Sequence, residues 1–166
     1  MKRAGHEVEL LDLYRSDFDP RLTASERATY YNPSAAVVDP LSAQLRRAEM
    51  IVLVFPTWWF SLPSILKGHF DRVFAPGVAF EHGDPIRPLL AALKHAVAIT
   101  TLGSPWWVDR FVMRRPVARV LKTAIFKSCA PDASFDYLAF YQAEAPAAGR
   151  IDAFDDRVKR RLARLS

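Results

Sequence analysis

The chain is poor in cysteine: Cys129 is the single thiol among its 166 residues. One thiol forms no disulfide within the chain and supplies no thiolate metal cluster. Because disulfides mark oxidising compartments, this composition favours a cytoplasmic protein. Cys129 ends an apolar helical pattern, so we expect it to be buried and unreactive rather than a nucleophile.

Long hydrophobic runs are missing as well. The most apolar stretch, residues 50–62, is shorter than the roughly 20 residues that span a bilayer, and Pro56 interrupts it. Lys2 and Arg3 are followed by no apolar segment, so the first residues are not typical of a secretory signal. We therefore expect no membrane span.

Several motifs that carry chemistry in other proteins do not occur. His82 and His95 lack the spacing of a metal-binding pair, so no metal site is expected. Ser61 and Ser104 lack the G-x-S-x-G frame around a hydrolase nucleophile. His69 lies beside a helical stripe and is interpreted as a packing or surface residue.

Acidic residues are outnumbered by lysine and arginine, 18 to 23, which gives a net charge of +5. Much of the excess lies in residues 110–122 and 157–164. The second group alternates with apolar residues, which is typical of an amphipathic helix whose basic side faces water. Attraction of an anionic cofactor or substrate is the alternative, and no nucleic-acid binding is expected.

What the chain does contain is ample core material, since 51% of it is hydrophobic and 12% aromatic. We expect residues 1–166 to form a single domain. Strands are predicted at residues 6–13, 50–55, 95–100 and 135–141, and helices at 39–49, 63–74, 117–129 and 151–165. This alternation is typical of an α/β fold, in which helices cover both faces of a parallel sheet.

Local signals add detail to this prediction. Residues 23–26 resemble a capping box and predict a short helical turn, and Asp39 before Pro40 is the expected N-cap of the helix 39–49. Residues 2–5 are typical of the last turn of a helix that ends at Gly5. The continuous apolar run 50–55 favours a strand buried on both faces. The buried stripe of the helix 117–129 is expected to consist of Val117, Val120, Leu121, Ala124, Ile125 and Cys129.

The segment after the strand 50–55 is the most informative part of the chain. It contains three adjacent aromatic residues, Trp58, Trp59 and Phe60, where ligands of parallel sheets bind, beyond the carboxyl ends of the strands. Pro63 opens the next helix, whose positive dipole end lies near the same spot. A planar heterocycle that gains negative charge on reduction would be stabilised there. The alternative is that these aromatics cap the sheet as core residues.

The string FPTWWFSLPSILKGHFDRVF (residues 55–74) resembles the flavin-ring loop and following helix of the flavodoxin-like NAD(P)H:quinone oxidoreductases, the flavodoxin-2 family. Residues 11–14, 18–20 and 100–103 add further matches, and the resemblance covers about residues 4–104. It implies a flavodoxin-like, doubly wound parallel sheet. The cofactor-binding residues it implies are Pro56, Thr57, Trp58, Trp59, Phe60, Thr100, Thr101, Leu102 and Gly103. Its implied substrate pocket consists of Phe80, Trp106 and Trp107.

The same resemblance implies a reaction. FAD, or alternatively FMN, would take hydride from NAD(P)H and reduce a quinone or similar flat acceptor in one two-electron step, in a ping-pong sequence. A homodimer is expected, in which Phe80 either covers the partner's flavin or serves ordinary packing. Trp106 and Trp107 would roof the pocket or form the dimer seam. The sequence itself does not choose between NADPH and NADH, although Arg110, Arg114 and Arg115 after residues 100–103 could meet a 2′-phosphate. The alternative function is a flavodoxin-type electron carrier or a non-catalytic remnant.

Two departures from the family pattern matter. Leu102 stands where the family has a glycine, and we expect it to crowd the ring edge or alter the turn. The family's first strand, which is central in the strand order 2-1-3-4-5, and its phosphate-binding turn find no match in this sequence. We therefore expect an N-terminally truncated domain with weak or no flavin binding, which an added segment of roughly 20 to 30 residues would restore.

Overall fold

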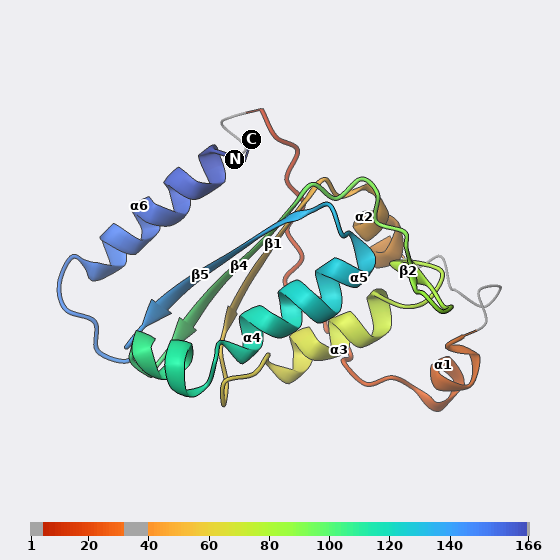
Figure 1. The fold of residues 1–166 in the computed structure, drawn as a ribbon, viewed down its shortest axis with the longest axis horizontal. Coiled ribbons are helices and arrows are strands. Elements are labelled where there is room, and N and C mark those ends of the chain that lie inside the picture. Colours follow the sequence, from red (N-terminus) through yellow and green to blue (C-terminus); the bar gives the residue numbers. More distant parts are fainter. Residues whose placement is uncertain (1–4, 32–39, 166) are drawn as a thin grey trace.

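The computed structural model describes residues 5–31 and 40–165. Its centre is a parallel sheet of three strands in the order β1-β4-β5 (Figure 1). The strands are β1 (Met50–Pro56), β4 (His95–Leu102) and β5 (Ser134–Tyr141). Met50 lies opposite His95, and His95 lies opposite Ser134, so all three strands start at the same end. Three of the four predicted strands and the α/β class are thereby confirmed.

The predicted helices are confirmed to within a few residues. They are α2 (Pro40–Arg47), α3 (Ser64–Val73), α6 (Arg150–Ala163), and α4 (Pro116–Arg119), which continues through a π-helix (Val120–Phe126) into α5 (Lys127–Cys129). Thr23 and Glu26 form the predicted capping box at the start of α1 (Ala24–Thr29). The expected N-cap Asp39 and residues 2–4 lie outside the described residues. Gly5 has a left-handed backbone with a φ of 83°.

A hairpin and a short π-helix were not predicted. A small hairpin pairs β2 (Phe80–Glu81) with β3 (Arg87–Pro88), and a short π-helix covers Val108–Val112. No helix in the described ranges is both long and apolar enough to cross a membrane.

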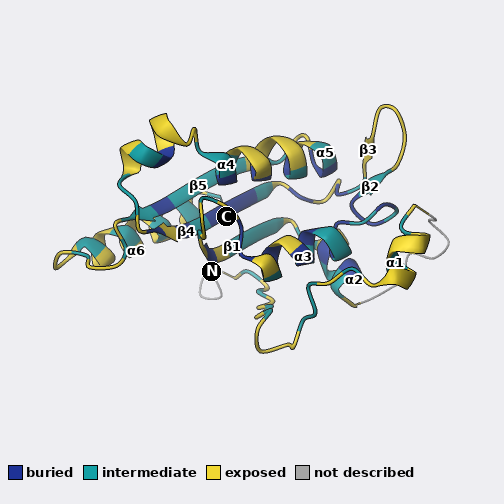
Figure 2. Ribbon diagram, turned by 90° about the horizontal axis from the view of Figure 1, so that it is seen from below, coloured by how far each residue is buried: buried dark blue, intermediate teal, exposed yellow. Residues whose placement is uncertain are grey.

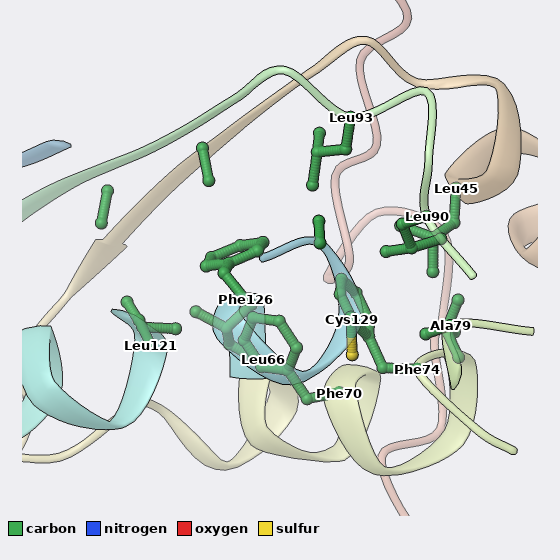
Figure 3. Close-up of a cluster of buried hydrophobic side chains, with 14 of the residues drawn as sticks. Leu45, Leu66, Phe70, Phe74, Ala79, Leu90, Leu93, Leu121, Phe126 and Cys129 are labelled. Carbon is green, nitrogen blue, oxygen red and sulfur yellow. The ribbon is translucent and has the colours of Figure 1, made fainter. Parts of the chain in front are cut away.

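The hydrophobic core lies on the face of the sheet that α2, α3 and the α4–α5 helix cover. Phe70 of α3 and Phe126 of the π-helix meet edge to face, with ring centroids 6.4 Å apart (Figure 3). Ala96 and Ala98 of β4 are fully buried, and their small side chains let the helices approach the sheet. Cys129 is buried in the same cluster, as predicted.

The prediction of a strand at residues 6–13 is wrong. The segment has no strand conformation, and the side chain of Leu10 is 90% exposed. An ion pair between Glu9 and Arg47 holds the segment against α2. In the flavodoxin-like strand order the second strand pairs with the first. No strand among residues 5–31 and 40–165 occupies that neighbouring position, so residues 6–13 make no ladder hydrogen bonds.

The prediction that β1 is buried on both faces is also wrong. Among the described strands β1 lies at an edge, and the side chain of Val54 is 76% exposed. Helix α6 is the element that covers this second face, and it packs against β5 rather than β1. Phe154 of α6 contacts Phe140, with ring centroids 5.2 Å apart, and Arg161 pairs with Asp136. Figure 2 shows that α6 itself has no buried residues, unlike the helices on the core face.

The buried stripe of the helix 117–129 is partly wrong. Val120 and Ala124 are exposed, whereas Phe126, which the periodicity left out, is buried. A π-helix has more residues per turn than an α-helix because its hydrogen bonds run from i to i+5. The π-helical stretch Val120–Phe126 therefore shifts the buried side by part of a turn, and the 3.6-residue pattern fails there.

The burial of Cys129 predicts its reactivity. Burial raises the pKa of the thiol from 9.0 to about 11. Because the thiolate is the nucleophile, we expect folded protein to react slowly with DTNB at pH 8 and faster only as the pH rises towards 11. Protein unfolded in guanidinium should release one equivalent at once. Rapid reaction of folded protein at pH 8 would contradict the burial.

Candidate functional site

The loop after β1 makes a tight hairpin turn with unusual residues. Trp58 N donates to Ser61 O at 3.1 Å, and Ser61 N donates to Trp58 O at 2.8 Å. Between them Trp59 and Phe60 both have positive φ, 48° and 54°. This is the geometry of a type I′ turn, which normally takes Asn-Gly. Non-glycine residues in this region cost about 1 to 3 kcal/mol each, and such strain is concentrated at functional sites.

The turn presents aromatic surface and hydrogen-bond donors to solvent. The side chain of Trp59 is 96% exposed and that of Trp58 is 63% exposed. These two residues therefore do not cap the core, which was the alternative interpretation. The backbone N–H groups of Trp59 and Phe60 donate no hydrogen bond within the part of the chain that the structure describes. A flat ligand at this turn would find a ring to lie against and two free donors.

The second loop lies directly beside the first. Thr57 N donates to Thr101 O at 2.9 Å, and the hydroxyls of Thr57 and Thr100 are 2.8 Å apart. Thr100 and Leu102 are buried, whereas Thr101 and Gly103 are exposed. The Leu102 side chain therefore points into the interior and does not crowd the exposed edge of the loop. Thr100 acts on the site by holding Thr57 rather than by facing a ligand.

Three further predicted residues are divided between the two ends of the molecule. Trp106 and Trp107 are half-exposed in the segment after Gly103, at the end where the strand arrows point (Figure 1). The Trp106 ring contacts Phe111, with centroids 5.8 Å apart. Phe80 belongs to β2 at the opposite end of the sheet and packs against the core. The structure does not bring Phe80 to the loops of its own chain.

A buried polar cluster near these loops was not predicted from the sequence. Asp109 is 1% exposed, accepts a hydrogen bond from the Tyr141 hydroxyl at 2.8 Å, and lies 3.9 Å from Arg115 Nε. Burial and this contact with Asp109 raise the pKa of Tyr141. Burial, followed by the charge of Asp109, raises the pKa of Tyr137, while nearby Thr57 opposes the shift. A lone aspartate in the string WWVDRF carries no sequence signal for such a cluster.

The two loops fit the ring of a flavin. The exposed indole of Trp59 offers a surface for stacking, and the two free backbone N–H groups offer hydrogen bonds. The hydroxyl contact between Thr57 and Thr100 fixes the orientation of the two loops. In the described ranges, no group of three or more histidine, cysteine or acidic side chains could hold a metal ion. The exposed indole and the two backbone donors could hold a flat aromatic ligand.

Comparison with protein families decides the classification: Flavodoxin_2, described as a flavodoxin-like fold, matches residues 1–165. The chain belongs to the Flavodoxin_2 family. Within it, the chain is 38% identical over 80 residues to an uncharacterized NAD(P)H oxidoreductase of Escherichia coli, YcaK. That alignment covers 46% of this chain and 41% of YcaK, so the chain spans well under two thirds of this relative.

Two further comparisons extend over most of this Flavodoxin_2 chain. An uncharacterized NAD(P)H oxidoreductase of Haemophilus influenzae is 28% identical over 170 residues, covering 98% of this chain and 77% of the relative. The solved structure of the NAD(P)H:quinone oxidoreductase from Methanothermobacter marburgensis has a TM-score of 0.77 against this chain, with 19% sequence identity. It covers 96% of this chain and 82% of that one, and supports the fold.

Proposed function

We propose that this Flavodoxin_2 chain binds a flavin, FAD or FMN, and acts as an NAD(P)H oxidoreductase that reduces quinones or similar flat acceptors. The observation that carries the proposal is the strained turn at Trp59 and Phe60. It places an almost fully exposed indole and two free N–H groups at the carboxyl ends of a parallel sheet. The names of the relatives from Escherichia coli and Haemophilus influenzae support the NAD(P)H-dependent chemistry.

The bound flavin would supply the redox chemistry, a two-electron exchange between NAD(P)H and the acceptor. The chain's own residues bind and orient. Trp59 would border the ring, and the backbone N–H groups of Trp59 and Phe60 would donate to its edge. The exposed backbone of Thr101 and Gly103 would contact the pyrimidine end. The Thr57–Thr100 hydroxyl pair holds the two loops in register, so that both contacts are made at once.

Donor and acceptor would use one open face of the ring in turn. Trp106 and Trp107 stand beside this face and would exclude water from a flat substrate that stacks there. We also propose a homodimer; Phe80 packs partly against the core of its own chain, at the end of the sheet opposite the loops. In a dimer Phe80 could reach the site of the partner subunit.

The proposed function is tested by turnover. Purified protein is mixed with excess FAD or FMN, NADPH and menadione, and absorbance of the nicotinamide band is followed. We expect a loss clearly above the control that contains free flavin without protein. No loss above that control would favour an electron carrier or a non-catalytic protein. Light scattering of the same sample tests the dimer.

A further inference from the structure

A shallow surface cavity of about 550 Å³, open to solvent, lies between residues 110–123 and strand β5. Five of its lining residues are cationic: Arg110, Arg114, Arg115, Arg119 and Lys122. We call it the basic cavity. Its volume is in the range of small-molecule sites, about 300 to 1,000 Å³. Phe111, Phe135 and Tyr137 add aromatic walls, and no carboxylate is among the described lining residues.

The positive charge of the basic cavity is poorly compensated. Arg110, Arg114, Arg119 and Lys122 form no ion pair with a described residue, and Arg115 has only Asp109, at 3.9 Å. Two buried polar atoms, Arg115 Nε and the Tyr137 hydroxyl oxygen, have no hydrogen-bond partner in the described ranges. Buried polar groups are normally hydrogen-bonded. Both residues line the cavity, so two polar groups in its wall are left unsatisfied by the described residues.

The backbone supports a binding role as well. Arg114 and Arg115 both have positive φ, 58° and 50°. The turn is fixed by Arg115 N, which donates to Asp109 O at 2.7 Å. Consecutive left-handed arginines are costly, and here the strained turn places both side chains on the wall of the basic cavity.

The basic cavity adjoins the proposed flavin loops. Tyr137 lines the cavity, and Thr57 of the first loop lies close enough to its hydroxyl to influence its ionisation. Asp109, which holds Arg115, belongs to the segment that carries Trp106 and Trp107. A ligand could therefore occupy the cavity with one end and reach the ring loops with the other.

We propose that the basic cavity binds the 2′-phosphorylated adenosine end of NADPH, and that the chain prefers NADPH to NADH. The inference rests on the proposed function. A phosphate dianion matches guanidinium groups, which bind it with two parallel hydrogen bonds. Adenine is flat and can stack on the aromatic walls. NADH lacks the 2′-phosphate, so it would leave the cationic groups without a partner.

Binding is tested first without flavin or turnover. Adenosine 2′,5′-bisphosphate, adenosine 5′-monophosphate and inorganic phosphate are titrated calorimetrically at low and at physiological salt. We expect the bisphosphate to bind at least about tenfold more tightly than either of the others, a difference of about 1.4 kcal/mol. Equal affinity for the bisphosphate and the monophosphate overturns the proposal. So does inorganic phosphate binding as tightly as the bisphosphate.

A matched pair of variants locates the site. Arg119→Glu with Lys122→Glu reverses two charges of the basic cavity, and Arg160→Glu with Arg164→Glu makes the same change in net charge at the end of α6. We expect the first pair to weaken bisphosphate binding at least about tenfold and the second to leave it unchanged, with circular dichroism confirming the fold of both. If both double variants lose bisphosphate affinity equally, the ligand does not bind in the basic cavity.

Steady-state kinetics with NADPH and with NADH distinguish this inference from the proposed function. The KM for NADPH should rise relative to the KM for NADH in Arg119→Glu with Lys122→Glu. If both nucleotides are oxidised with equal KM in the unaltered protein, the cavity proposal fails while the proposed function stands. If neither is oxidised but the bisphosphate still binds selectively, the proposed function fails and the nucleotide site stands.

Discussion

Replacing Trp59 with Asn and Phe60 with Gly is expected to weaken flavin binding strongly while leaving the protein at least as stable. Asn-Gly is the preferred pair for a type I′ turn, so the substitution removes the strain of two positive φ angles. Trp59 is almost fully exposed and loses little packing when replaced. We expect the free energy of unfolding to rise by about 1 kcal/mol, and flavin affinity to fall by at least about tenfold, that is about 1.4 kcal/mol.

Flavin fluorescence quenching and urea denaturation measure the two effects separately. Asp17→Gly is a suitable control, because Asp17 also has a positive φ, 50°, in a different part of the chain. It should relieve strain in the same way without changing flavin affinity. Unchanged flavin affinity in the Asn-Gly variant would show that this turn is not the ring site.

Replacing Asp109 with Ala is expected to cause the largest loss of stability. The substitution removes the acceptor of the Tyr141 hydroxyl and leaves Arg115 without its carboxylate partner. Breaking a buried charged hydrogen bond leaves its partners unsatisfied. We expect the free energy of unfolding to fall by about 2 to 4 kcal/mol, measured by urea denaturation with its midpoint and slope.

A second variant keeps this prediction testable if Asp109→Ala does not fold. Tyr141→Phe removes the other partner of the hydrogen bond and should cost less, because the carboxylate stays beside Arg115. With Asp109→Leu, which has no acceptor oxygen, it completes a double-mutant cycle, in which we expect a coupling of about 0.5 to 3 kcal/mol. Strictly additive effects would contradict a direct contact between the two side chains.

The periodic parts of the fold were predictable because their signal is local. The apolar run 50–55 and the alternating pattern of 151–165 predicted β1 and α6 close to their observed bounds. The segment 6–13 has a comparable pattern but is not a strand, since a strand also needs a neighbour to complete its hydrogen bonds. The exposed Val54 shows the same limit: an apolar run indicates a strand but not what covers each face.

The candidate site likewise has parts that the sequence predicted and parts that it did not. The loop of residues 57–60 was predicted to border the ring, and the structure shows Trp58 and Trp59 at the surface, in the loop that lies beside residues 100–103. Neither the left-handed turn at Trp59 and Phe60 nor the inward direction of Leu102 could be predicted, because both depend on how the loops leave the sheet.

The sequence alone determined most of the alternation of strands and helices, the family resemblance and the position of the aromatic loop, since each depends on residues close together in the chain. The tertiary structure decided which side chains from distant parts of the chain come into contact. The Asp109 carboxylate accepts a hydrogen bond from Tyr141, and the arginines of residues 110–119 line one cavity with residues of β5. Both contacts arise because a parallel sheet aligns the ends of distant strands. The buried cluster and the basic cavity arise from that convergence, which no local pattern encodes.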